Sequence, residues 1–199
     1  MAATSHSTDA RNEILDTAQA VMSAKGFSAV GLNEILAKAG VPKGSFYHYF
    51  PSKEAFGTAL LERYFKDYLI EMEERFSQPG MDGAAHLMSY WDKWLETQRA
   101  EDTASKCLVV KLSAEVADLS DAMRLVLLSG TKSIVERLAR AIDAAVADGS
   151  LAPVADSQLL AETLYQTWLG ASLLSKITRN DAPLKTAMIA TRRSLKLEK

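Results

Sequence analysis

The chain has 199 residues, of which 48% are hydrophobic and 24% are charged, and its formal net charge is −2. This length allows one well-packed core, or one core with a small satellite domain, and no window approaches the ~18 consecutive apolar residues of a membrane span. Cys107 is the single cysteine, which excludes a disulfide within the chain. Residues 1–13 lack the basic start and apolar run of a secretory signal, so we expect a cytoplasmic protein in a reducing compartment, without a membrane partner.

The first two predicted helices have the apolar periodicity of amphipathic helices. The first is expected to begin at a cap formed by Thr8 or Asp9 and to stop at Gly26, and the second covers residues 32–39 and closes at Gly40. The sequence AGV that follows predicts a tight turn, because Gly40 can adopt the left-handed conformation. Two short helices joined in this way are typical of a helix-turn-helix, whose second helix enters the major groove of DNA.

The second helix of this pair is predicted within VPKGSFYHYF, from Val41 to Phe50. Pro42 fits the first turn, where its missing N–H costs nothing, and Phe46 and Phe50 are expected to point inward and anchor the helix. The residues expected to face DNA bases or phosphates are Lys43, Gly44, Ser45, Tyr47, His48 and, at the start of the following helix, Lys53. The alternative is a helical hairpin packed in a core, with the aromatic residues as ordinary filler.

Further amphipathic helices are predicted along the rest of the chain, and no run of alternating β-branched residues indicates a strand. Ser52 is expected to cap a long helix that ends near Phe76. The later helices are expected at residues 82–101, 105–117, 120–147, 156–178 and 182–197. We therefore predict an all-α fold of about nine helices, with a three-helix DNA-binding domain at residues 1–51 and a larger helical regulatory domain at residues 52–199.

The sequence AGVPKGSFYHYFPSKEAF resembles the signature of the TetR family of one-component bacterial transcription regulators, and the length and helical pattern agree with that family. The resemblance implies a homodimer that binds double-stranded operator DNA and carries a sensing body, without enzymatic activity, cofactor or metal. It adds Tyr49 to the DNA-contacting residues. It also implies that Asn33 partly substitutes for a capping Thr, since Gly31 stands at that position, and that Leu36 in place of a small Ala sets the two helices slightly apart.

Cys107 lies near a predicted helix start, in a setting that favours its thiolate form. Ser105 can cap that helix, and Lys106 and Lys111 place positive charge near the sulfur. The alternative is a small buried hydrophobic residue, the usual state of a single cysteine. The sequences KCLVVKLSAEVADLSD and LYQTWLGASLLSKITR resemble the branch of the family typified by the repressor of N-ethylmaleimide reductase. That resemblance implies that Cys107 senses reactive electrophiles and oxidants and that Lys176 can approach its sulfur.

Large side chains of the C-terminal body provide two further predictions. A pocket for a hydrophobic effector could be lined by Tyr68, Tyr90, Trp91, Trp94 and Met123. At helical spacing, such residues are more often ordinary core residues. The last two helices are expected to build a two-fold, four-helix dimer interface through Leu164, Trp168, Ala171 and Met188.

The predicted function is repression by a reduced dimer, which releases its operator when an electrophile or oxidant modifies Cys107. A close alternative keeps the repressor but makes a noncovalent hydrophobic ligand the effector, with Cys107 as a bystander. An all-α enzyme with Cys107 as nucleophile has little support, because His6, His48 and His86 are distant in sequence and no HExxH motif or phosphate loop is present. A protein-binding helical module would show no salt-dependent affinity for DNA.

Overall fold

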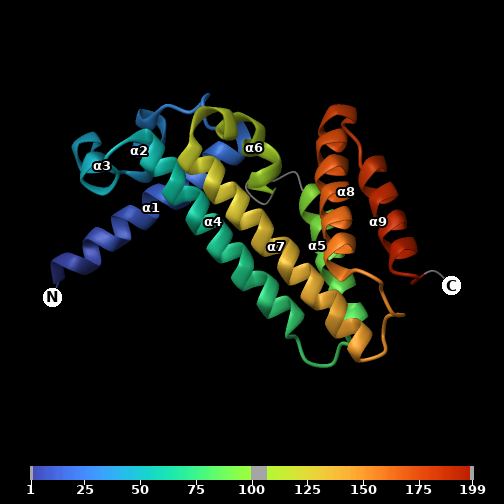
Figure 1. Ribbon diagram of the computed structural model, residues 1–199. Coiled ribbons are helices and arrows are strands. Elements are labelled where there is room, and N and C mark those ends of the chain that lie inside the picture. The colour runs from blue at the N-terminus through green and yellow to red at the C-terminus, as the bar shows by residue number, and fades with distance from the viewer. Residues whose placement is uncertain (1, 100–106, 198–199) are drawn as a thin grey trace. The chain divides into compact units, whose positions relative to one another are not determined.

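The computed structural model describes residues 2–99 and 107–197, with side chains from Ala10 onward. Within these residues the structure consists of helices joined by turns and contains no strand, which confirms the predicted all-α fold (Figure 1). The nine helices of this part of the chain are α1 (Ala2–Lys25), α2 (Leu32–Ala39), α3 (Lys43–Tyr49), α4 (Lys53–Phe76), α5 (Gly83–Arg99), α6 (Leu108–Leu119), α7 (Asp121–Ala147), α8 (Ser157–Thr178) and α9 (Ala182–Ser194). None of these helices is both long and apolar enough to cross a membrane.

The chain folds into two compact units that share two helices. The first unit is Met1–Phe65 with Glu101–Leu128, and the second is Lys66–Ala100 with Ser129–Lys199. Helices α4 and α7 each begin in the first unit and end in the second. The first unit therefore contains the helix-turn-helix together with α6, whereas the functional boundary after residue 51 stays a prediction.

Two glycines end the first two helices as predicted. Gly26 and Gly40 have positive φ angles of 94° and 65°, which residues with a Cβ rarely adopt. Behind these turns, Ile14, Ile35 and Phe46 from three different helices are fully buried and form the centre of the α1–α3 bundle. The turns at Gly26 and Gly40 thus set the path of the α1–α3 bundle, and the apolar helix faces that the periodicity predicts form its core.

Several predicted helix ends differ in the structure, among them the start of α6, which is Leu108 rather than residue 105. Helix α1 begins at Ala2 rather than at a cap formed by Thr8 or Asp9, because no Gly or Pro lies in between to stop the helix. Helix α9 ends at Ser194, earlier than predicted, because the chain turns at Lys196, whose φ is 55°.

The start of α4 is fixed by a cap and by close packing within the first unit. Ser52 caps the helix as predicted, since its Oγ accepts a hydrogen bond from Ala55 N at 3.0 Å. One turn later, Gly57 permits a close approach: an added Cβ would lie 2.5 Å from Met123 Sδ and 2.7 Å from the Phe27 ring. The beginning of α7 therefore packs directly on α4.

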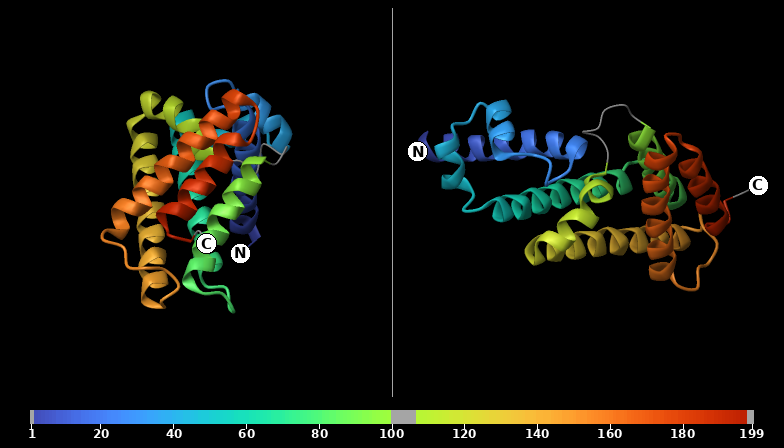
Figure 2. Two further views of the ribbon diagram at one scale, coloured as in Figure 1. Left: turned by 90° about the vertical axis from the view of Figure 1, so that its right-hand side faces the viewer. Right: turned by 90° about the horizontal axis from the view of Figure 1, so that it is seen from above.

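Tryptophans fill the core of the second unit. Trp91 of α5 stacks on Trp168 of α8, with ring centroids 5.2 Å apart and an interplanar angle of 18°. The indole N–H of Trp94 donates to Ser172 Oγ, and that of Trp168 donates to Thr191 Oγ1, both at 2.9 Å. These contacts tie α5, α8 and α9 together, and α8 and α9 lie side by side in every view (Figures 1 and 2).

Candidate functional site

The short helix α3 and its C-cap Phe50 have two different faces. Phe46 and Phe50 are buried and form an aromatic cluster with Phe56 of α4, with ring centroids 5.0 to 5.4 Å apart. The outer face consists of the exposed residues Lys43, Gly44, Tyr47 and His48 and the half-buried residues Ser45 and Tyr49. The inward pair is confirmed, whereas DNA contact by the outer face stays a prediction.

Gly44 is not required by the packing of its own subunit. No heavy atom lies within 4 Å of an added Cβ, and its φ is not in the left-handed region. Glycine inside a helix costs about 0.5–1 kcal/mol relative to alanine. The packing of the described residues therefore does not explain the glycine, and a close approach of DNA at Gly44 stays a prediction. Pro42 is the N-cap of α3, one position before the predicted first turn, because its ψ of 141° is extended.

Lys53 is engaged inside the subunit, a role that its sequence position does not suggest. Its Nζ donates to Val30 O at 3.1 Å and lies 4.9 Å from the centroid of the Phe27 ring. This fixes the start of α4 to the segment before α2. Asn33 is exposed in the first turn of α2, whose N-cap Gly31 provides no side-chain cap. Contacts of Lys53 and Asn33 with DNA stay predictions.

Cys107 is the N-cap residue of α6, and it is half-buried. Its Sγ accepts a hydrogen bond from Tyr64 Oη at 3.6 Å. A hydroxyl donor and a helix N-terminus are both features that stabilise thiolates, the reactive form, in proteins. The prediction that Ser105 caps this helix is wrong, because Cys107 itself is the N-cap of α6. Ser105 and the predicted adjacent cation Lys106 lie outside the described residues. Lys176 belongs to α8 in the second unit, and its approach to the sulfur stays a prediction.

Glu115 fastens α6 to the loop between α1 and α2. Its carboxylate accepts hydrogen bonds from the backbone N–H of Phe27 at 3.0 Å and of Ser28 at 2.5 Å. Gly26 leaves room for it, since an added Cβ would lie 3.1 Å from Glu115 Oε2. Burial raises the pKa of Glu115, but the hydrogen bonds from Ser28 and Phe27 and the charge of Lys111 outweigh burial and hold this pKa below its ordinary value of 4.5. We call this contact the Glu115 link.

Comparison with known proteins identifies the family. Residues 14–60 match the model for bacterial regulatory proteins of the tetR family, and residues 83–191 match the model for the tetracyclin repressor-like C-terminal domain. The chain belongs to the TetR family. It is therefore a DNA-binding transcriptional regulator and not an enzyme, and the hypothesis of an electrophile-processing enzyme is dropped. The described side chains include no group of three or more His, Cys, Asp or Glu placed to hold a metal ion.

Several characterised TetR-family proteins resemble the chain over most of its length. It is 38% identical to the HTH-type transcriptional repressor NemR of Escherichia coli K12 over 180 residues, or 90% of each chain. It is 32% identical to the HTH-type transcriptional repressor DhaR of Mycobacterium sp. GP1 over 177 residues, or 89% of this chain and 87% of the relative. The crystal structure of reduced E. coli NemR matches it with a TM-score of 0.87 over 93% of this chain and 96% of that chain.

The predicted effector residues of this TetR chain are divided between the two units. Tyr68, Tyr90, Trp91 and Trp94 belong to the second unit, where the two tryptophans are buried and the two tyrosine hydroxyls lie 2.8 Å apart. Met123 belongs to the first unit, against α4. The burial of the tryptophans agrees with ordinary core residues, the alternative interpretation, and their role in a pocket stays a prediction.

The predicted dimer interface needs a correction. Leu164 and Trp168 have exposed fractions of 2% and 0%, and Ala171 is also buried, whereas Met188 is half-buried. The prediction is wrong for Leu164 and Trp168, because they fill the core of their own subunit. The exposed apolar residues of α8 and α9 are Leu159, Leu173, Leu174, Ile177 and Ile189, with exposed fractions of 48% to 68%. TetR-family regulators usually act as dimers, and we call these five residues the outer apolar face.

Proposed function

We propose that this TetR-family protein is a transcriptional repressor that binds operator DNA as a homodimer and releases it when an electrophile or oxidant modifies Cys107. The observation that carries the proposal is the position of Cys107 at the start of α6, the helix that the Glu115 link joins to the helix-turn-helix. Similarity to the repressor NemR, whose solved structure is of the reduced form, supports a redox-dependent repressor. Because its partner is chromosomal DNA, we place the protein in the cytoplasm.

The outer face of α3 is the proposed DNA-reading surface. Phe46 and Phe50 hold the helix rigidly, so Tyr47 and His48 can present their polar atoms to base edges or phosphates in the major groove. Lys43 adds a positive charge to this face. Because the net charge of the chain is only −2, its overall repulsion of phosphates is weak. A few cations near α3 are therefore enough to attract the DNA backbone to this surface. We expect salt-dependent affinity, as for every protein that displaces counterions from DNA.

The outer apolar face is the proposed dimer contact. Leu173, Leu174 and Ile177 cluster near the end of α8, and each is more than half exposed. Exposed apolar residues gathered in this way mark interaction surfaces, and a two-fold axis would pair the same residues from both subunits. Such a dimer presents two α3 helices to the two halves of a pseudo-palindromic operator, with centres about 34 Å or a multiple apart.

Two chemical routes can modify Cys107. Its thiolate can attack an activated C=C bond, which forms a C–S bond while the resulting carbanion takes a proton from water. Alternatively, a peroxide can transfer one oxygen to the sulfur and give a sulfenic acid, which an amine then attacks to form an S–N bond with loss of water. The chain has no second cysteine to resolve the sulfenic acid, so Lys176 is the proposed amine.

The Glu115 link is the proposed route from the sulfur to the DNA-binding bundle. A group added to Cys107 would disturb the contact of its sulfur with the Tyr64 hydroxyl at 3.6 Å, and we expect the start of α6 to shift in response. Glu115 lies eight residues further along the same chain, about 12 Å at 1.5 Å per residue. It holds the loop that leads from α1 into α2. A coupling free energy of about 1–3 kcal/mol through this contact changes operator affinity roughly 5- to 150-fold.

One observation favours the alternative of a noncovalent effector. Trp91 is fully buried, and its indole N–H finds no acceptor among the described residues. Buried donors are nearly always satisfied by protein, water or ligand. A hydrophobic effector with one acceptor atom beside Trp91 would meet this requirement, and Cys107 would then be a bystander.

Operator binding by wild type and Cys107→Ser, with and without N-ethylmaleimide, tests the proposal and separates it from the alternative. The probe is the DNA that flanks the gene for this protein. We expect wild type to bind this DNA with an affinity that falls as the salt concentration rises, and to release the DNA after alkylation. Cys107→Ser should bind the DNA equally well, and N-ethylmaleimide should not change its affinity. A Cys107→Ser variant that still releases DNA would reject the cysteine mechanism, and absence of binding by unmodified wild type would reject the repressor at this site.

A further inference from the structure

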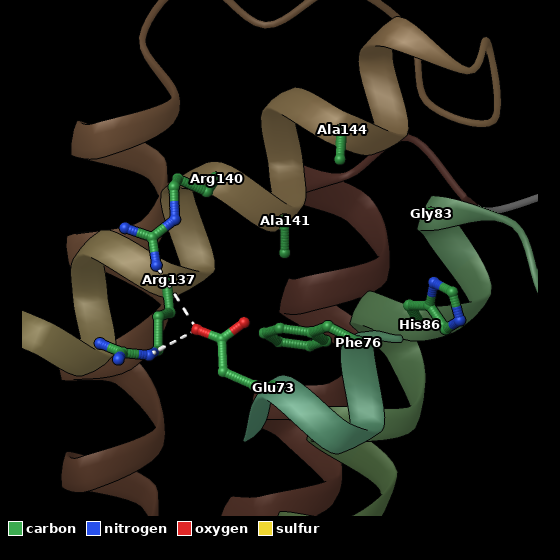
Figure 3. A pocket seen from close by; sticks show the side chains of 8 residues that line it. All are labelled: Glu73, Phe76, Gly83, His86, Arg137, Arg140, Ala141 and Ala144. Atoms are coloured by element: carbon green, nitrogen blue, oxygen red, sulfur yellow. Dashed lines mark ion pairs between the residues drawn. The ribbon is translucent and has the colours of Figure 1, made fainter. Parts of the chain in front are cut away.

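A cavity of about 160 Å³ lies in the second unit, between the end of α4, the start of α5 and the second half of α7 (Figure 3). One side is apolar and consists of Phe76, Ala141 and Ala144, while Gly83 leaves the wall of α5 without a side chain at that point. The cavity contains neither Cys107 nor any residue of the outer face of α3. It is therefore separate from both parts of the proposed function.

The opposite side carries two arginines that converge on one carboxylate. Glu73 Oε1 lies 2.7 Å from Arg137 Nε and 3.5 Å from a terminal nitrogen of Arg140, and both dashed lines in Figure 3 end on this oxygen. Among the residues that line the cavity, the two guanidinium groups exceed the single carboxylate of Glu73 by one positive charge. A terminal nitrogen of Arg137 donates to Ser133 O at 3.2 Å, whereas its buried Nε contacts Glu73 as an ion pair without hydrogen-bond geometry. Arg140 is 64% exposed, and the N–H groups of its planar guanidinium can donate to a second carboxylate.

The other polar groups at the cavity are already engaged. His86 Nε2 lies 2.7 Å from Gln78 O, and because a carbonyl only accepts, this nitrogen carries a proton and donates. Asp148 does not line the cavity, and its carboxylate accepts from Gly83 N at 2.7 Å and from Ser150 N at 2.9 Å. The uncompensated charge of the lining residues therefore stays at the arginine end.

We propose that this cavity binds a small aromatic monocarboxylate of about the size of benzoate. The carboxylate pairs with Arg140 beside Glu73, and the ring lies on Phe76 and Ala141. An apolar cavity of about 150 Å³ holds one benzene ring, so the observed volume of about 160 Å³ matches one ring with a small substituent. A doubly charged phosphate ester exceeds the single positive charge available and leaves the apolar side without a partner.

Calorimetric titration of the full-length protein with sodium benzoate tests this site, with benzamide as the neutral isostere. We expect a dissociation constant for benzoate on the order of 1 mM, which is ordinary for a ligand of this size, and at least tenfold weaker binding of benzamide. Arg140→Gln should weaken benzoate binding about tenfold by removing one charge-assisted pair. Ala144→Leu should block it by filling the cavity, and Ala144 is exposed enough to accept the larger side chain.

Lys132→Gln is the matched control, because Lys132 is an exposed cation of α7 that does not line the cavity. This variant should bind benzoate as wild type does. Absence of benzoate binding below about 20 mM would overturn the proposal, since this is far weaker than such a pair should give. Equal binding of benzamide would also overturn it, as would benzoate binding that Arg140→Gln leaves unchanged. If Ala144→Leu does not fold, benzoate binding by Arg140→Gln is sufficient to test the proposal.

Discussion

Replacing Glu115 by Gln should break the Glu115 link while keeping the size of the side chain. The carboxylate now accepts two backbone N–H bonds, from Phe27 and from Ser28. A glutamine has one acceptor oxygen and one NH₂ donor. One of the two backbone N–H groups would therefore lose its acceptor and face a donor.

The magnitude follows from the exposure of the two bonds. A hydrogen bond to a charged group contributes about 1.5–3 kcal/mol. Here the Phe27 bond is partly buried and the Ser28 bond is exposed, so both are weakened by solvent. We expect Glu115→Gln to lower the free energy of unfolding by about 1–2 kcal/mol in urea titrations followed by circular dichroism. Asp118→Asn, at an exposed position of the same helix, should change it by less than about 0.5 kcal/mol.

The functional consequence is measured by fluorescence anisotropy with labelled operator DNA. Glu115→Gln should bind the operator within a few-fold of wild type, because its α3 face is intact. Alkylation of Cys107 lowers operator affinity by some factor in wild type, and in Glu115→Gln this factor should be at least about fivefold smaller. A fivefold difference corresponds to a coupling of about 1 kcal/mol. A Glu115→Gln variant that has the stability of Asp118→Asn and still releases DNA fully would refute the link as the transmission route.

Three further predictions concern pH and two glycines. In the folded protein the pKa of Glu115 lies below 4.5, so wild type should exceed Glu115→Gln in stability by the full amount above pH 4.5. This difference should shrink as the pH falls through the folded pKa. Urea titrations at several pH values measure it, and a difference that persists in acid would contradict the charged contact. Gly44→Ala should stabilise the fold by about 0.5–1 kcal/mol and weaken operator binding in anisotropy, and undiminished affinity would remove Gly44 from the DNA interface. Gly83→Ala should lower the free energy of unfolding by about 1–3 kcal/mol, because its Cβ would lie 2.5 Å from Ala145 Cα. If urea titrations give this variant the stability of wild type, α5 and α7 separate without cost and the prediction fails.

Local sequence signals predicted the parts of the fold that depend on neighbouring residues. Gly26 and Gly40 end helices because their backbone conformation suits glycine, and Ser52 begins one because its hydroxyl reaches an N–H three residues on. The inward pair Phe46 and Phe50 could be predicted for the same reason, since their helical spacing sets them on one face of α3.

Contacts between distant residues could not be predicted in this way. The bonds from Phe27 and Ser28 to Glu115 span 88 and 87 residues, and an exposed glutamate would give the same local pattern. The sequence position of Lys53 at a helix start predicts a phosphate contact, yet in the structure its ammonium contacts Val30 O and the Phe27 ring. These roles depend on which segments meet in the fold.

Helix α8 shows how periodicity can indicate the wrong face. It carries apolar residues on two sides: Trp168 faces the core of the second unit, whereas Leu173 and Ile177 face outward. Sequence spacing identifies both stripes but does not tell which one packs on its own subunit. In the inward position the indole N–H of Trp168 donates to Thr191 Oγ1, a contact visible only in the packed structure.

The most direct test of the central claim is a titration in which alkylation of Cys107 and release of operator DNA are measured in the same samples. Mass spectrometry gives the fraction of subunits modified at Cys107, and anisotropy gives the fraction of DNA still bound. We predict that DNA release rises with the fraction modified at this residue and that Cys107→Ser stays bound throughout. Complete modification of Cys107 with the operator still bound at wild-type affinity would contradict the account.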